Sequence, residues 1–480
     1  MARVFISATH KSSGKTTLSI GLCAALHAQG LKVQPFKKGP DYIDPLWLGA
    51  ASGRACHNLD FNTMTQDEII QTVQHYSHDA DIALIEANKG LYDGMALDGS
   101  DSNAAVAKLT CSPIVLVVDT RGMTRGIAPL LLGYQSFDRD VNIAGIIFNR
   151  VGGARHATKL RESVEHYTGI KVLGAVHNNP DMEIEERHLG LMPSNESGEA
   201  EAQIARIRDL VAAQVDLGLL REIAVGAVEL ERNPSQPPLI RGGAEYDSES
   251  LSPSPDKGRV GEGFLKIAIC QDPAFGFYYP GDLEALQQAG AQLLPVNTLK
   301  DAALPANIDG LFIGGGFPET HMQPLAANTS MRASIRAAID NGLPAYAECG
   351  GLMYLSRSLV WNGQQADMVG VIPGDAVMHP KPQGRGYVKL QETADMPWPG
   401  GDREKIINAH EFHYSGLENL TATGKFAYRM QRGSGIDGQH DGWVYRNLLA
   451  SYTHMRDTSQ YRWAQRFVEF IRQQKRKTAS

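Results

Sequence analysis

The length, composition and charge of this chain exclude several classes of protein. Its 480 residues, 42% hydrophobic and 21% charged, exceed what one hydrophobic core usually holds and predict a globular protein of two or three domains. The formal net charge of −7 argues against a nucleic-acid-binding surface, and no apolar run is long enough to span a membrane.

Cysteine usage favours a reducing compartment. The five cysteines are odd in number, widely scattered and without a C-x-x-C pair, which disfavours a disulfide framework or a zinc site. The N-terminus enters a strand-like run directly, without the basic leader and apolar stretch of a signal peptide. We therefore expect a cytoplasmic protein that binds neither nucleic acid nor membrane.

Residues 1–231 alternate strand and helix patterns. Short apolar runs predict strands and amphipathic runs predict helices between them. The strands are expected at 4–7, 31–36, 81–87, 113–119 and 143–149, and the helices at 15–28 and 154–168. This βαβ rhythm predicts a mostly parallel sheet covered by helices on both faces.

A second α/β domain is predicted after a linker. Residues 232–263 are rich in Pro, Ser, Gly and Glu and carry no apolar period, so we assign them to an interdomain linker and 264–480 to the second domain. Strands are expected at 264–269, 308–313, 344–348 and 448–452, helices at 283–289, 331–341 and 460–474, and an antiparallel excursion at 367–429. The fold class is therefore α/β with two domains.

A phosphate-binding loop follows the first predicted strand. A Walker A-like pattern opens the helix at 15–28, where backbone N–H groups and a lysine bind phosphates. The residues that we expect to bind ATP are Gly14, Lys15, Thr16 and Thr17. The Thr16 hydroxyl is also a candidate Mg²⁺ ligand. Thr9 replaces the first glycine of the pattern, so a chance match on a surface helix is the alternative. The strand before the loop and the proline-free helix after it favour the phosphate site.

Carboxylates follow the neighbouring predicted strands. Asp41 and Asp44 come after the second strand. Glu86 lies at the end of the third, and Asp93 is in the loop beyond it. The carboxyl ends of strands form the ligand-binding edge of an open α/β sheet, and Mg²⁺ prefers oxygen ligands. We therefore predict a magnesium site formed by Asp41 and Glu86 with Thr16, although each carboxylate taken singly is also compatible with an ordinary loop or cap residue.

Two further features bear on nucleotide use. Asn149 ends the strand predicted at 143–149 and is a candidate for reading a nucleotide base. Lys11 lies one place from the signature-lysine position of partition ATPases, so a partition-type switch that dimerises on nucleotide is the rival from another functional class. That rival predicts neither a second α/β half nor a nucleophilic cysteine.

A cysteine stands at a sharp turn in the second domain. Cys349 follows an apolar strand in the sequence Glu-Cys-Gly-Gly at 348–351, a turn that exposes a nucleophile and places the Gly350 N–H beside it. His454, after the strand predicted at 448–452, is the expected partner that raises the thiolate fraction. Gly315, in the run Gly-Gly-Gly at 314–316, is expected to supply the second oxyanion donor. We interpret the other four cysteines as buried small apolar residues.

These residues, in this order, resemble the cobyrinic acid a,c-diamide synthase family. The match extends through most of the chain, and its longer motifs are specific. The motifs lie at 39–45, 58–60, 149–152, 186–191, 384–387, 410–415 and 450–452. The resemblance implies an ATP-binding domain similar to dethiobiotin synthetase, followed by a flavodoxin-like class I glutamine amidotransferase domain.

The resemblance also implies a reaction and roles for further residues. Glutamine would yield ammonia at Cys349 and His454, ATP with Mg²⁺ would phosphorylate the a and c acetate carboxylates of a cobalamin-pathway tetrapyrrole, and ammonia would displace phosphate. By position in the family motifs, Asp44 and Asp93 would activate or hold the carboxylate, and Tyr42 would contact the macrocycle. The oligomeric state stays open, with a homodimer as one option.

Several positions depart from related patterns. Ordinary class I amidotransferases carry Glu two places after the histidine, where this chain has Arg456; the synthase family also lacks that acid. Leu46 to Gly49 lack the histidine often found after the Asp-Pro of the family motif. Siroheme, nickel-sirohydrochlorin and hydrogenobyrinic acid, which share acetate side chains on a similar ring, therefore remain alternative substrates.

Overall fold

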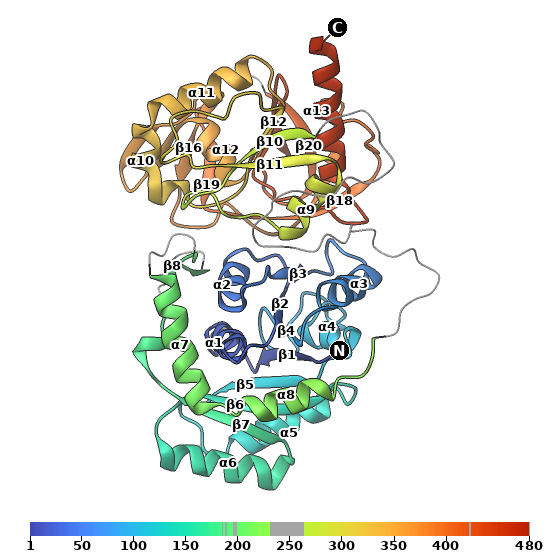
Figure 1. The fold of residues 1–480 in the computed structure, drawn as a ribbon, viewed down its shortest axis with the longest axis vertical. Coiled ribbons are helices and arrows are strands. Elements are labelled where there is room, and N and C mark those ends of the chain that lie inside the picture. The colour runs from blue at the N-terminus through green and yellow to red at the C-terminus, as the bar shows by residue number, and fades with distance from the viewer. Residues whose placement is uncertain (185, 188–189, 195–198, 231–263, 422–423, 480) are drawn as a thin grey trace. The chain divides into compact units, whose positions relative to one another are not determined.

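The computed structural model describes residues 1–184, 186–187, 190–194, 199–230, 264–421 and 424–479 (Figure 1). The chain divides into two compact units, Met1–Leu239 and Ile240–Ser480, which we describe separately. The linker predicted at 232–263 lies outside the described residues and stays a prediction. Residues 188 and 189 of the motif at 186–191 also lie outside them.

The N-terminal unit is built on a seven-stranded sheet in which all strand pairs are parallel. The strand order is β3-β2-β4-β1-β5-β6-β7. These strands are β1 (Arg3–Ala8), β2 (Val33–Lys38), β3 (His57–Leu59), β4 (Ile82–Glu86), β5 (Ile114–Asp119), β6 (Ile143–Val151) and β7 (Lys171–His177). A separate two-stranded ribbon joins β8 (Glu186–Arg187) to β9 (Gly190–Leu191). The predicted parallel sheet is confirmed.

Helices cover both faces of this sheet. One face packs against α3 (Gln66–Tyr76), α4 (Asn103–Leu109), α5 (Ile127–Phe137) and α6 (Ala154–Thr168). The other packs against α1 (Lys15–Ala28), α2 (Ile43–Ser52), α7 (Ala200–Gln214) and α8 (Leu217–Val225), as Figure 1 shows. A short 3₁₀ turn, η1 (Pro180–Met182), precedes the ribbon. Because both faces are covered, strands β1, β4 and β5 are buried along their whole length, as parallel strands usually are.

The C-terminal unit contains a nine-stranded sheet that is half parallel and half antiparallel. Its order is β11-β10-β12-β13-β22-β21-β20-β17-β18. The parallel part is formed by β10 (Leu265–Cys270), β11 (Ala291–Val296), β12 (Gly310–Ile313), β13 (Ala345–Glu348) and β22 (Leu448–Ser451). The antiparallel part is formed by β17 (Gly384–Glu392), β18 (Ile406–His413), β20 (Lys425–Arg432) and β21 (His440–Tyr445).

A second, four-stranded sheet completes the predicted antiparallel excursion. Its strands are β14 (Ser356–Trp361), β15 (Gln364–Asp367), β16 (Ile372–Met378) and β19 (Ser415–Glu418). The pairing is antiparallel except between β14 and β16, which run parallel. The excursion predicted at 367–429 is therefore confirmed, with β14 and β15 added before it.

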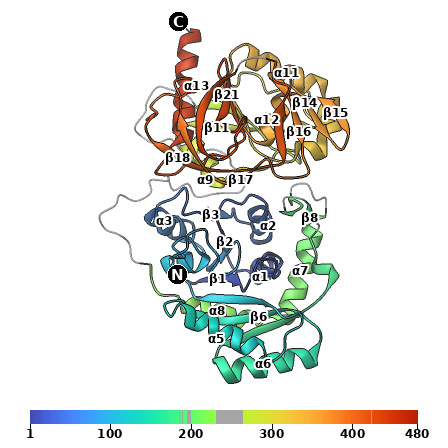
Figure 2. The same cartoon turned by 180° about the vertical axis from the view of Figure 1, so that it is seen from behind.

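Helices lie on both sides of the large sheet. One core packs α9 (Pro280–Gln288) and α13 (Trp463–Ala479) against it. The opposite core packs α10 (Met322–Ala327), α11 (Thr329–Asp340) and α12 (Gly350–Leu355), with the 3₁₀ turn η2 (Pro318–His321) beside them. Figure 2 shows α13 and α11 on opposite sides of the unit. Among the described residues, no helix combines the length and the apolar character that crossing a membrane would need.

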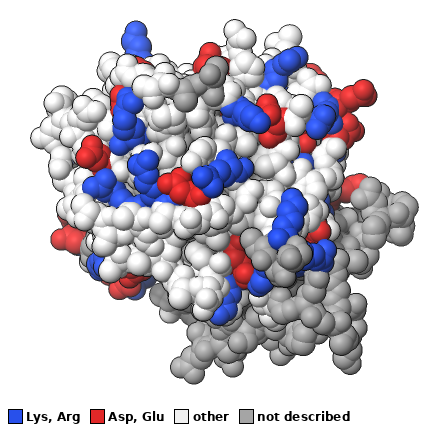
Figure 3. Space-filling view, turned by 90° about the horizontal axis from the view of Figure 1, so that it is seen from above, with Lys and Arg blue, Asp and Glu red and all other residues white. Residues whose placement is uncertain are grey.

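Surface charge is mixed in sign. On the face drawn in Figure 3, Lys and Arg side chains are interspersed with Asp and Glu. The described residues of this face therefore do not form an extended field of one sign. In open α/β sheets, ligands bind at the carboxyl ends of the parallel strands.

Candidate functional site

The loop between β1 and α1 has the backbone of a phosphate site. Ser12 and Gly14 adopt positive φ values of 64° and 81°, and α1 begins at Lys15 without a side chain capping its N-terminus. The first-turn N–H groups are thus left to an anionic ligand. A Cβ on Gly14 would lie 2.1 Å from Nδ2 of Asn149, so this position needs glycine for space as well as for its left-handed backbone.

Lys15 and Thr16 both contact one buried carboxylate. Lys15 Nζ lies 2.7 Å from Glu86 Oε1, and the Thr16 hydroxyl donates to the same oxygen at 2.8 Å. The hydroxyl also lies 3.2 Å from Asp44 Oδ2. Burial lowers the pKa of Lys15, and Glu86 opposes that shift. The structure therefore brings together four of the predicted site residues, from the start of α1, the first turn of α2 and the end of β4.

Lys37, to which the sequence analysis assigned no role, is the cation at the centre of this cluster. Its ammonium contacts the carboxylates of Asp44 and Glu86, the latter at 3.1 Å, and donates to Ala87 O at 3.2 Å. Burial alone would lower the pKa of Lys37, but Asp44, Glu86 and Asp41 raise it above its ordinary value. Lys37 therefore stays charged and balances the acidic residues. In the sequence, only the position of Lys37 in a lysine pair at the end of an apolar strand could have indicated this role, and that pattern is weak evidence.

Asp41 and Asp44 differ in environment. Asp41 Oδ1 accepts the backbone N–H groups of Ile43 and Asp44 at 3.0 and 3.1 Å and so caps α2. Burial and the charge of Asp44 raise the pKa of Asp41 to about 7. Burial acts in the same direction on Asp44, but Lys37 and Lys15 outweigh it and lower the pKa of that carboxyl. One carboxylate of the pair is thus held ionised beside two lysines.

The residues present fit a magnesium ion that is shared with phosphates. Glu86 is fully buried, and its Oε2 atom has no hydrogen-bond partner among the described residues, which is costly unless a ligand fills the position. No three His, Cys, Asp or Glu side chains of the described part of the chain are arranged to hold a metal by themselves. Mg²⁺ commonly takes one or two carboxylates and completes its shell with phosphate and water, so Glu86, Asp41 and Thr16 suit it.

The remaining residues predicted for this unit lie around the loop. Asn149 Nδ2 donates to Ser13 O at 2.8 Å, so one amide donor supports the loop, and its base-reading role stays a prediction. Asp93 Oδ2 accepts Gly90 N at 3.0 Å, and a Cβ on Gly90 would lie 2.9 Å from Thr9 O, which places the Asp93 turn against the phosphate loop.

Two further predicted residues lie at the N-terminal ends of helices. Tyr42 is buried next to Asp41, at the start of α2. Thr17 is half-buried in the first turn of α1. Their predicted roles in substrate and nucleotide binding stay predictions.

Cys349 occupies a strained turn between β13 and α12. Its φ and ψ are 46° and −101°, a conformation that non-glycine residues seldom adopt. Its backbone N–H donates to Ser451 O at 2.7 Å, which joins the turn to the end of β22. Burial and nearby Glu319 raise the pKa of the thiol, and the Gly350 N–H opposes them. The geometry is that of a nucleophile elbow.

His454 and Gly315 meet beside this elbow. Strands β13 and β22 are parallel neighbours with Glu348 opposite Ser451, so Cys349 and His454 leave the same edge of the sheet. A Cβ on Gly315 would lie 2.6 Å from His454 Cε1, and one on Gly350 would lie 3.0 Å from Gly316 N. The predicted nucleophile, base and oxyanion glycines are thus gathered at one place.

Two side chains beside His454 were not assigned roles by the sequence analysis. The ring of His410 stacks on that of His454, with centroids 5.0 Å apart and planes 15° from parallel. Glu348 Oε2 lies 3.4 Å from His454 Nδ1. His410 belongs to the motif at 410–415 and Glu348 to the Glu-Cys-Gly-Gly turn at 348–351, and only the pairing of distant strands brings them to the histidine.

The expectation for the other cysteines is wrong at one position. Cys23, Cys56 and Cys270 are buried as predicted, whereas Cys111 is exposed. Cys111 has a positive φ of 46° in the turn between α4 and β5, and such a turn lies on the surface because it connects two packed elements.

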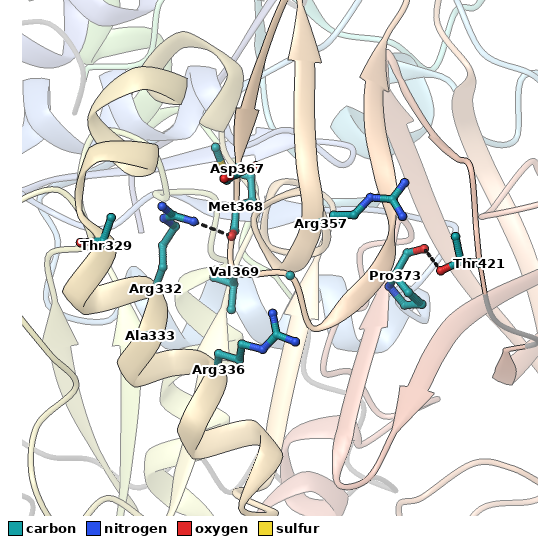
Figure 4. Close-up of a pocket in the computed structure, with 11 residues that line it drawn as sticks. Thr329, Arg332, Ala333, Arg336, Arg357, Asp367, Met368, Val369, Pro373 and Thr421 are labelled. Carbon is teal, nitrogen blue, oxygen red and sulfur yellow. Dashed lines mark hydrogen bonds between the residues drawn. The ribbon is translucent and has the colours of Figure 1, made fainter.

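A cavity of about 530 Å³ in the C-terminal unit contains none of the predicted site residues. Figure 4 shows its lining between α11 and the strands β14 to β16. Arg332 donates to Met368 O at 2.9 Å, and Arg357 pairs with Asp375 at 2.6 Å. These arginines are engaged with the protein itself, so we do not place the chemistry here.

Comparison with known proteins identifies both units. Residues 4–191 match the CobQ/CobB/MinD/ParA nucleotide binding domain, and residues 266–460 match the CobB/CobQ-like glutamine amidotransferase domain.

Curated relatives match nearly the whole chain. Cobyrinate a,c-diamide synthase of Magnetococcus marinus is 44% identical over 471 residues, which are 98% of this chain and 97% of that protein. The enzymes of the same name from Methanosarcina acetivorans and Archaeoglobus fulgidus are 39% and 38% identical, over 94% and 97% of this chain and 92% and 97% of theirs.

Proposed function

The chain belongs to the cobyrinate a,c-diamide synthase family of glutamine-dependent amidating ligases, and we propose that it converts cobyrinate into its a,c-diamide with ATP and glutamine. The observation that carries this proposal is the presence, in one chain, of a phosphate loop backed by a carboxylate and lysine cluster and of a strained cysteine elbow beside a histidine. A carboxylate-activating site and an ammonia-releasing site are what an amidation from glutamine requires.

The N-terminal unit would activate the carboxylate. The free N–H groups at the start of α1 and the Lys15 ammonium bind the phosphates of ATP. An acetate oxygen of the substrate attacks the γ-phosphorus of ATP, and the bond from that phosphorus to the β-phosphate oxygen breaks. ADP departs, and the substrate carboxylate has become an acyl phosphate. Asp44, held ionised by Lys37, and Asp93, against the phosphate loop, orient the substrate side of the site. Mg²⁺, held by Thr16, Asp41 and Glu86, would neutralise phosphate charge when bound.

The C-terminal unit would release ammonia. The Cys349 thiolate attacks the carboxamide carbon of glutamine, and the oxyanion formed is stabilised by N–H groups at Gly315 and Gly350. His454 takes the thiol proton and passes it to the leaving nitrogen, so that ammonia departs and a thioester remains. Water then hydrolyses the thioester to glutamate. Each ammonia attacks one acyl phosphate, expels inorganic phosphate and forms one amide.

A partition-type ATPase switch remains less well supported. It accounts for the phosphate loop but not for the Cys349 turn with its φ of 46° or for the second α/β unit. Lys11, the residue that motivated it, is exposed. Lys37 is instead the second buried lysine of the phosphate site.

The identity of the substrate can be tested by measuring the mass of the product. The purified chain is offered cobyrinate, hydrogenobyrinate, siroheme or nickel-sirohydrochlorin with ATP, Mg²⁺ and glutamine. We expect cobyrinate to show the mass change of two amidations, with ATP consumed in step with glutamate formed. Amidation of siroheme or nickel-sirohydrochlorin but not of cobyrinate would reject the proposed substrate and keep the chemistry.

A further inference from the structure

Glu348 is a buried carboxylate with each oxygen in a defined position. It ends β13, immediately before Cys349, and is 3% exposed. Its Oε1 accepts the Tyr346 hydroxyl at 2.6 Å and the Met455 backbone N–H at 2.8 Å. Because these two donors fix Oε1, Oε2 is turned to His454 Nδ1, 3.4 Å away. The contact with Met455 also ties Glu348 to the segment that carries the histidine.

The other side chains near His454 cannot accept its Nδ1 proton in this way. Arg456, two places further along the chain, has no acceptor, and its guanidinium lies over the ring of Tyr279 at 5.0 Å. His410 stacks on the His454 ring face to face rather than edge to edge. Glu319 is buried and acts electrostatically on the Cys349 thiol. Among the described contacts, Glu348 is therefore the carboxylate paired with the histidine.

We propose that Glu348 is a positioning residue of the glutamine site. Its carboxylate accepts a hydrogen bond from Nδ1 of His454 and so directs Nε2 of that ring to the reacting atoms. The inference rests on the thiol chemistry proposed above. A carboxylate behind the imidazole holds one tautomer and stabilises the imidazolium that forms when the thiol proton is taken, which is the role of the acid in hydrolase triads. The acid here comes from the residue before the nucleophile, on the neighbouring strand.

The arrangement also explains why a charged residue is buried here. A lone carboxylate away from water is costly, and pairing with donors offsets that cost. Two of the donors, Tyr346 and the Met455 N–H, could have been satisfied by a neutral oxygen. The charge itself is needed only if a cation forms next to it, and His454 is the group beside it that can become one.

The test separates the charge of Glu348 from its packing. Glu348→Gln keeps an oxygen for Tyr346 and Met455 but removes the charge. We expect glutamine hydrolysis in the full-length enzyme to fall by about 10²- to 10⁴-fold, mainly in kcat, in the range seen when the acid of a triad is neutralised. Amidation driven by added ammonia should keep its wild-type rate. Glu348→Asp should recover part of the lost hydrolysis.

A pH profile distinguishes positioning from simple support. Glu348→Gln removes the negative charge that favours the protonated imidazole, so the acid limb of kcat/KM for glutamine, below which the base is protonated, should move to lower pH. Glu418→Gln is the matched control, because Glu418 forms an exposed pair with His379 at 3.0 Å in the same unit. That control should leave both rates and the profile unchanged.

Three results bear on the proposal in different ways. Glutamine hydrolysis in Glu348→Gln within about threefold of wild type, or an unmoved acid limb, would overturn it. Equal loss of the ammonia-driven reaction would also overturn it, because it would show that the substitution damages the fold. If instead Cys349→Ala keeps glutamine hydrolysis, the proposed thiol chemistry itself is wrong, and that outcome does not depend on Glu348.

Discussion

Lys37 and Glu86 are direct partners across the parallel strands β2 and β4, and their charged groups lie 3.1 Å apart. Both side chains are buried. Lys37 also contacts Asp44, and Glu86 also binds Lys15 and Thr16. The strand pairing therefore links the end of β2, the end of β4 and the phosphate loop through one charge cluster. Loss of a buried member should affect the ATP-dependent half of the reaction and spare the glutamine half.

Replacing Lys37 tests the role of this cluster. Lys37→Met leaves Asp44 without its main cation, and we expect amidation with either glutamine or ammonia to fall by on the order of 100-fold or more, as when an electrostatic contact to a reacting group is lost. Glutamine hydrolysis should continue. Lys108→Met removes an exposed lysine that pairs with Asp138 and should change neither rate, because surface pairs contribute little. Equal activity of the two variants would contradict the assignment.

Gly14 should be intolerant of a side chain for reasons of space. Gly14→Ala places a Cβ 2.1 Å from Asn149 Nδ2 at a φ of +81°, so the loop and Asn149 must separate and ATP affinity should fall at least about tenfold. Gly30→Ala has the same strain, at φ +83°, but meets nothing within 4 Å. That control should lose about 1–2 kcal/mol of stability and keep its ATP affinity. Calorimetric titration with a non-hydrolysable ATP analogue measures the affinity of each variant. Equal affinities of Gly14→Ala and Gly30→Ala would count against the loop geometry.

Gly315 should be restricted by His454. A Cβ there would lie 2.6 Å from His454 Cε1, so Gly315→Ala should displace the ring and lower glutamine hydrolysis by about 10²-fold or more, because small misplacements of catalytic groups are that costly. Ammonia-driven amidation should persist. Gly416→Ala brings a Cβ 3.5 Å from His379 Nε2, an ordinary contact, and should be silent. An active Gly315→Ala enzyme would argue against the proposed site.

His410 should make the stability of the protein pH-dependent. Burial, with the charges of His454 and Arg456, lowers the pKa of His410 well below its ordinary value. The unfolded chain therefore takes up a proton on His410 near pH 6.5, whereas the folded protein does not. The stability that the neutral His410 contributes is complete above pH 6.5 and is lost as the pH falls below it.

Substitution of His410 isolates that contribution. His410→Phe keeps a ring against His454 but cannot titrate, so its unfolding free energy should fall less steeply below pH 6.5, by up to about 1.4 kcal/mol per pH unit. Denaturant titrations followed by tryptophan fluorescence suit this comparison, because four of the five tryptophans lie in the C-terminal unit. If the unfolding free energies of the wild type and His410→Phe changed with pH in parallel, the lowered pKa of His410 would be contradicted.

Much of the fold follows from local sequence. Helices α1 and α6 begin and end at the predicted residues, because glycines lie close to their ends and because α6 has a clear amphipathic period. Strand β2 starts and ends two residues later than predicted. It includes Lys37 and Lys38, which are buried by ionic and backbone partners rather than by apolar character. The three-residue strand β3 was not predicted, since so short a run has no detectable period.

The site was predictable only in part, for a related reason. Residues at strand ends, such as Glu86, Cys349 and His454, follow from the rule that ligands bind at the carboxyl edge of a parallel sheet. Lys37, Glu348 and His410 acquire their partners through strand register and through pairing over 49, 106 and 44 positions of sequence respectively. Local patterns contain no information on such pairing, so these three residues were found only in the structure.

The division of labour between the two units is tested most directly with Cys349→Ala. The variant and the wild type are each given cobyrinate, ATP and Mg²⁺ with either glutamine or an ammonium salt, and the product is followed by mass spectrometry. We predict that the variant forms no diamide from glutamine but forms it from ammonia at the wild-type rate. Diamide formation from glutamine, or failure with ammonia in a folded variant that still binds ATP, would contradict this account.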